Sequence, residues 1–124
     1  SKPIGTVNTY TIELLKKKGI TKKFRSKSWI TFSTNSEITM DLVITVCGNA
    51  RDEECPYWPG NPLRAHWGVP DPAYIKGSSS KKEIAFSKVY NILEKRAKAF
   101  LDLEFENMKS DTLQKNIDNI SRIV

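Results

Sequence analysis

The 124-residue sequence lacks any apolar run of the roughly 18 residues that a membrane-spanning helix requires. Its first residues also lack the charged-then-apolar layout of a secretory signal. With two cysteines, it has no disulfide framework of the kind that small secreted domains use. These absences predict a cytoplasmic globular protein of single-domain size, with no membrane as a partner.

Histidine is nearly absent as well, because His66 is the only one in the chain. Cys47 and Cys55 are separated by seven residues. Structural zinc sites usually space paired cysteines by about two to four residues, so neither a metal nor another cofactor is expected. The two thiols are left with two interpretations, as inert core residues or as a redox pair.

Acidic residues are absent from a stretch of 12 residues that supplies much of the net charge of +6. The stretch contains Lys16, Lys17, Lys18, Lys22, Lys23, Arg25 and Lys27. A solvated helix C-terminus, where cations interact favourably with the dipole, is one interpretation. Attraction of a small oxyanion or of nucleic acid is the other. Nucleic acid is not expected as a partner, because no aromatic interleaving or known binding motif accompanies the cations.

Helices are predicted from caps and from apolar residues at helical spacing. Asn8 can cap a helix over residues 9–18, which Gly19 would end in a left-handed conformation. Residues 80–83 (SKKE) have the form of a capping box that opens a longer helix. Its apolar stripe is Ala85, Val89, Leu93, Ala97 and Phe100, with Ile92 beside it. A short helix is expected around residues 28–33.

A last helix is expected after Ser110 or Asp111. One side of it would carry Leu113, Ile117, Ile120 and Val124.

Two strands are predicted between these helices. Residues 40–46 (MDLVITV) are almost continuously apolar or β-branched, which is typical of a parallel strand that is covered on both faces. The second strand is expected over residues 63–67, after a proline-rich loop of about 15 residues. This order of elements predicts an α/β fold. Since two strands are few for a stable sheet, further structure is expected before Ser1.

Cys47 directly follows the first predicted strand. Ligand sites in open α/β sheets lie beyond the carboxyl ends of strands, so this position favours a functional thiol. A polar spacer would let its sulfur meet that of Cys55. Arg51 would favour the thiolate, whereas the acidic residues 52–54 oppose it. Both interpretations of the thiols therefore remain open from the residues alone.

Asp71 lies in a loop that Pro70 and Pro72 stiffen on either side. A carboxyl group held in this way can protonate a leaving oxygen when an oxyanion is displaced. The other interpretation is a turn or cap, because aspartate before proline commonly opens a turn. His66 and Trp67, which precede this loop, are expected to be structural residues.

Several stretches combine into a more specific pattern. They are residues 41–50 (DLVITVCGNA), 55–56 (CP), 59–60 (PG), 66–68 (HWG) and 71–73 (DPA), together with residues 25–29 (RSKSW). This combination resembles the thiol-dependent arsenate reductases of the low-molecular-weight tyrosine phosphatase family. The resemblance covers about residues 1–101, with residues 102–124 as a C-terminal helical extension. It implies three layers, a parallel sheet with helices on both faces, from which the first βαβ unit is expected to be absent.

The resemblance also implies a mechanism that reduces arsenate to arsenite. A cysteine in an N-terminal Cys-x5-Arg loop attacks arsenate, and an acid at the position of Asp71 protonates the departing oxygen. A thiol at the position of Cys47 then attacks the first sulfur, and one at the position of Cys55 displaces it. Thioredoxin or a glutaredoxin-like dithiol protein reduces the resulting disulfide.

The sequence departs from this family pattern in two respects. It contains no Cys-x5-Arg, because the residue six after Cys47 is Glu53, so the chain by itself is expected to be inactive. The spacing from Cys47 to Cys55 is also one residue longer than in the best-known members. Two alternatives remain. One is a tyrosine phosphatase of the same fold, which needs neither thiol, and the other is a non-catalytic, thiol-bearing interaction module.

The chain is predicted to be fragile, because a sheet without its central strand leaves backbone edges unpaired. We expect a broad, poorly cooperative thermal transition or a strand-exchanged oligomer. Circular dichroism melting and analytical ultracentrifugation measure these two outcomes. A sharp two-state melt of a monomer would contradict the prediction.

Overall fold

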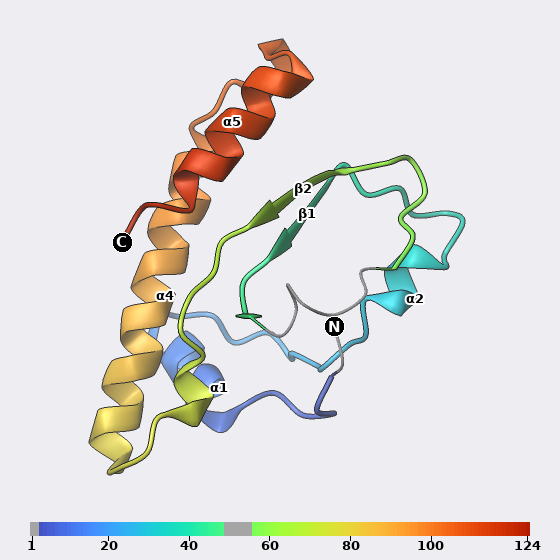
Figure 1. Ribbon diagram of the computed structural model, residues 1–124. Helices are drawn as coiled ribbons and strands as arrows, with labels where there is room; N and C mark the ends of the chain where they lie inside the picture. Colours follow the sequence, from blue (N-terminus) through green and yellow to red (C-terminus); the bar gives the residue numbers. More distant parts are fainter. Residues whose placement is uncertain (1–2, 49–55) are drawn as a thin grey trace.

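The computed structural model describes residues 3–48 and 56–124, in which helices pack beside a short parallel sheet (Figure 1). The helices are α1 (Thr9–Lys17), α2 (Ile30–Ser33), α4 (Ser79–Leu101) and α5 (Ser110–Ile120), with 3-10 helices η1 (Pro72–Tyr74) and η2 (Phe105–Asn107). The strands are β1 (Leu42–Thr45) and β2 (Leu63–His66). The predicted α/β organisation with parallel strands is confirmed. None of the described helices is long and apolar enough to cross a membrane.

The two strands pair in parallel, with Leu42 opposite Leu63. Pairing extends beyond both strand ends. The Leu63 amide donates to the Asp41 carbonyl at 3.0 Å, and the Val69 amide donates to the Val46 carbonyl at 2.9 Å. The regular part of β1 is therefore shorter than predicted, but the hydrogen-bonded stretch matches the predicted strand.

One face of the sheet forms the core with α5. The buried residues of this cluster are Ala65, Trp67, Ile117 and Ile120, and Leu42, Ile44, Leu63, Leu113 and Ile123 are among those that pack around them. The predicted inner side of the last helix is confirmed for Leu113, Ile117 and Ile120. It is wrong for Val124, which is 80% exposed, because α5 ends at Ile120 and the chain no longer follows helical spacing. Ile123 packs inward instead.

Both predicted ends of α1 are confirmed. The Asn8 side chain accepts a hydrogen bond from the Tyr10 amide at 2.9 Å and so caps the helix. Gly19 has a φ of 79°, and the Ile20 amide beyond it donates to the Leu15 carbonyl at 2.9 Å. This arrangement is a left-handed helix end of the Schellman type, which glycine adopts without a Cβ clash.

Helix α4 begins two residues before the predicted position, so the expected capping box at residues 80–83 is wrong. Ser78 caps the helix, and its hydroxyl accepts from the Lys81 amide at 3.4 Å. Gly77, with a φ of 130°, allows the sharp entry turn directly before this cap. The buried residues of α4 are Phe86 and Arg96, whereas the predicted stripe is half-buried and its Ala97 is exposed.

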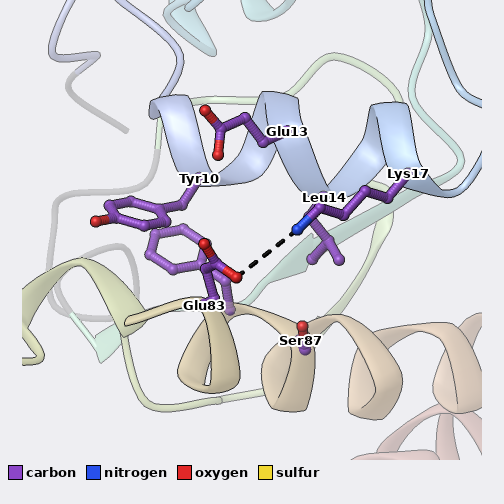
Figure 2. A pocket seen from close by; sticks show the side chains of 7 residues that line it. Tyr10, Glu13, Leu14, Lys17, Glu83 and Ser87 are labelled. Carbon is purple, nitrogen blue, oxygen red and sulfur yellow. Dashed lines mark ion pairs between the residues drawn. The ribbon is translucent and has the colours of Figure 1, made fainter. Parts of the chain in front are cut away.

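Helix α1 lies against α4, and a small cavity of about 50 Å³ remains between them (Figure 2). Beside it, the Tyr10 ring stacks on the Phe86 ring with centroids 5.4 Å apart. Lys17 lies 3.7 Å from a carboxylate oxygen of Glu83, an exposed ion pair of the kind that contributes little stability. Aromatic and apolar packing therefore holds the two helices together.

The opposite face of the sheet carries a polar pair. The Thr45 hydroxyl lies 2.8 Å from the His66 Nδ1, which agrees with the predicted structural role of His66. Gly68 follows closely, and a Cβ at that position would lie 2.7 Å from the His66 Nε2. A side chain at Gly68 would therefore displace the His66 ring.

We predict that Gly68→Ala destabilises the protein by about 1–3 kcal/mol, the usual cost of overpacking a fitted site. Chemical denaturation measures this change. The three atoms nearest to the added methyl group all belong to the His66 ring, so in a His66→Ala background the same substitution should cost much less. Equal costs in the two backgrounds would show that His66 is not the obstacle.

Candidate functional site

Cys47 and the loop over residues 70–72, called the Asp71 loop, both lie beyond the carboxyl ends of the two parallel strands. Cys47 directly follows Val46, and Asp71 is two residues beyond Val69. The bond between the Val69 amide and the Val46 carbonyl therefore ties the two exits together at the carboxyl ends of parallel strands. This is the edge at which open α/β sheets carry their ligand sites.

The two predicted relay thiols are not equally defined. Cys47 is half-buried at the end of β1. Cys55 lies outside the described residues, as does Arg51. The pairing of Cys47 with Cys55 therefore stays a prediction. Within residues 3–48 and 56–124, no three histidine, cysteine or acidic side chains gather as a metal site.

Asp71 is exposed and caps η1. Its Oδ1 accepts a hydrogen bond from the Ala73 amide at 2.9 Å, so the cap interpretation of this aspartate is realised in the structure. Capping fixes the direction of the carboxyl group at the start of the turn. The cap engages Oδ1, and the role of Asp71 as a general acid stays a prediction.

Pro72, the residue after this aspartate, is anchored by the helices. It lines a largely apolar cavity of about 180 Å³ between α1, η1 and α4. The other residues of the wall are Thr11, Leu14, Leu15, Phe86, Val89, Tyr90 and Leu93. The loop is thus held on one side by the sheet and on the other by the packing of α1 on α4.

Tyr90 makes one polar contact within α4 and one with the C-terminal cap of α1. Its hydroxyl donates to the Glu94 carboxylate at 3.1 Å, and the Lys18 ammonium lies 5.0 Å from the ring centroid. The hydrogen bond from Tyr90 holds the pKa of Glu94 below its ordinary value, and Lys98 and Lys18 act in the same direction. Burial, followed by the neighbouring carboxylate, raises the pKa of Tyr90.

The basic stretch begins in the last turn of α1, where Lys16 and Lys17 face the negative end of the helix dipole. Together with the contacts of Lys17 and Lys18 to α4, this supports the interpretation as a helix end for the first three cations. Anion attraction by the cations beyond Gly19 stays a prediction.

Arg96 is the residue of this region that the sequence did not reveal. The residue is 3% exposed, and it donates from Nη1 to the Trp67 carbonyl at 2.7 Å and to the Gly68 carbonyl at 3.3 Å. Burial lowers the pKa of the guanidinium. No pattern distinguishes Arg96 from the exposed Lys95 and Lys98 beside it, and arginine is rarely this buried.

Comparison with known proteins places this arrangement in a family. Three arsenate reductases each align with the chain over 62 residues, which are 50% of this chain and 44% of each relative: those of Halalkalibacterium halodurans at 44% identity, Bacillus licheniformis at 42% and Bacillus subtilis at 40%. The aligned part thus spans less than half the length of these relatives. A family model described as low molecular weight phosphotyrosine protein phosphatase matches residues 1–118 and agrees with the expected three-layer α/β fold. The chain therefore belongs to the low molecular weight phosphotyrosine protein phosphatase family.

Proposed function

We propose that this chain supplies the relay thiols and the acid of an arsenate reductase. Cys47 and Cys55 carry the thiol exchange, and Asp71 donates a proton to the departing oxygen of arsenate. One observation supports this proposal. The Val69–Val46 hydrogen bond holds the segment that leads to Cys47 beside the segment that leads to Asp71, at the carboxyl ends of the two strands. The names of the three relatives support arsenate as the substrate.

The reaction begins at a thiolate in a Cys-x5-Arg loop, which these 124 residues do not contain. That thiolate attacks arsenic and forms a sulfur–arsenic bond, while an oxygen protonated by Asp71 leaves as water. The Cys47 thiolate then attacks the first sulfur. The sulfur–arsenic bond breaks with its electron pair on arsenic, so As(V) becomes As(III) and the two sulfurs form a disulfide.

Cys55 completes the relay. Its thiolate attacks the Cys47 sulfur and releases the first cysteine as a thiolate, which leaves a disulfide between Cys47 and Cys55. A thioredoxin- or glutaredoxin-like dithiol protein returns two electrons through a mixed disulfide and is itself oxidised. The half-buried position of Cys47 suits this role, since its sulfur must reach the loop cysteine and must then be reached by the Cys55 thiolate.

A phosphatase is the second candidate, and the description of the matching family model favours it. Phosphoester hydrolysis in this fold would use the loop cysteine and Asp71. It would need neither Cys47 nor Cys55, so the two thiols distinguish the two activities.

We predict that mild oxidation of the chain with diamide produces an intramolecular disulfide between Cys47 and Cys55. Peptide mass mapping after alkylation detects it, and thioredoxin with its reductase and NADPH should reduce it stoichiometrically. Cys55→Ser is the control, because it leaves Cys47 without a resolving thiol. A disulfide that dithiothreitol reduces but that neither thioredoxin nor a glutaredoxin reduces would contradict the relay.

We predict arsenate turnover when a Cys-x5-Arg segment of the kind expected for this family is fused ahead of Ser1. Cys47→Ser should release no arsenite. Cys55→Ser should release one equivalent and stop, because only the later exchange requires this thiol. Asp71→Asn should slow arsenite release by about 10²–10⁴-fold, the usual contribution of a general acid.

The matched measurement is hydrolysis of p-nitrophenyl phosphate by the same fusions. Full hydrolysis in Cys47→Ser and Cys55→Ser, without arsenite release from the unsubstituted fusion, would replace the reductase by the phosphatase.

A further inference from the structure

Arg96 connects the end of the chain with the exit of β2. Its Nη1 donates to the Trp67 and Gly68 carbonyls, and its Nε donates to the Ile123 carbonyl at 2.9 Å. All three acceptors are neutral, so the charge of the donor strengthens each hydrogen bond without an opposing carboxylate. The guanidinium plane therefore holds two distant backbone segments in a fixed relation.

The segment on one side leads directly to Asp71. After Gly68 the chain makes the hydrogen bond from Val69 to Val46 and then enters the loop between Pro70 and Pro72. Proline fixes φ, so this loop has few internal rotations with which to absorb a displacement of Gly68. A change in the backbone direction at Gly68 is consequently carried to the carboxyl group.

The segment on the other side is the C-terminal part of the chain, which lies alongside β2. The Trp67 indole N–H donates to the Ile117 carbonyl at 3.0 Å, and the Gln114 side chain donates to the Arg64 carbonyl at 2.8 Å. Ile123 also packs against the core. The predicted extension over residues 102–124 thus hydrogen-bonds with β2 and with Trp67, in the segment that leads to the Asp71 loop.

We propose that Arg96 is a positioning residue for Asp71, and that it acts by holding the exit of β2 against the C-terminal segment. This role rests on the proposed function, in which Asp71 is the acid. Arginine suits the position because its rigid fork presents Nε and Nη1 in one plane. Lysine offers a single ammonium group and cannot keep the Trp67 and Ile123 carbonyls in the same geometry.

The experiment compares R96Q and R96K with K95M in the full chain. Lys95 is the matched control, because it neighbours Arg96 on α4 and donates to the Val124 carbonyl at 3.0 Å rather than to Trp67 or Gly68. Amide hydrogen exchange measures the protection of two amides. That of Val69 reports on the segment that leads into the Asp71 loop, and that of Leu63 reports on the start of β2. Both amides donate to the residues that flank β1, Leu63 to Asp41 and Val69 to Val46.

We expect R96Q to lower the protection of the Val69 amide roughly tenfold relative to Leu63, as the loss of charged hydrogen bonds implies. R96K should recover part of this ratio, and K95M should leave it unchanged. Should R96Q fail to fold, R96K is compared with the unsubstituted protein. A greater loss of protection at Val69 than at Leu63 supports the proposal, and equal losses overturn it. Equal losses at Val69 and Leu63 would mean a general structural role and would overturn the proposal.

The acid itself gives a second measurement. The Ala73 amide donates to Asp71, so its NMR shift should follow the titration of that carboxyl group in the unsubstituted protein and in K95M. R96Q should reduce or displace this pH-dependent shift, and R96K should partly restore it. An unchanged titration in folded R96Q would contradict positioning. Neither readout uses arsenate, so failure here is distinct from failure of the reductase proposal.

Discussion

The parallel pairing of β1 and β2 is the constraint on which the candidate site depends. Because the strands run in the same direction, the segments that follow them begin at the same end of the sheet. The Val69–Val46 hydrogen bond extends the pairing into these segments. Antiparallel strands would have placed Cys47 and the Asp71 loop at opposite edges. The thiol–disulfide chemistry proposed here requires the first arrangement, since Asp71 protonates an oxygen on arsenic and Cys47 attacks the sulfur that is bonded to the same arsenic.

The C-terminal helix completes this arrangement by covering the sheet. Ile117 is fully buried beneath Trp67, whose indole N–H is satisfied by the Ile117 carbonyl. Other parts of the chain are covered less well. The total accessible surface is 9350 Å², whereas a compact monomer of 14.1 kDa exposes about 6,700 Å². β1 is half-buried along its whole length although its residues are apolar or β-branched, so this strand buries less apolar surface than its composition would allow.

Local signals in the sequence were reliable where a single backbone interaction decides the outcome. The Asn8 cap, the left-handed Gly19 and the continuous apolar stretch before Cys47 each predicted the structure that is found. The helix start near residue 80 was wrong, because several adjacent serines offer similar caps and the turn at Gly77 selects Ser78. Val124 was wrong because helical spacing was extended past the end of α5.

The sequence by itself determined the α/β class, the positions of most helices and the family resemblance, because these depend on periodicity, caps and contiguous motifs. Only the tertiary structure decided that Arg96 is buried against the Trp67 carbonyl, whereas the Asp71 cap is a local contact that the sequence already offered as one of two interpretations. The physical reason is that the hydrogen bonds of Arg96 join residues far apart in the chain. The acceptors of Arg96 are backbone carbonyls, which every residue carries, so no residue type in the sequence could have marked them.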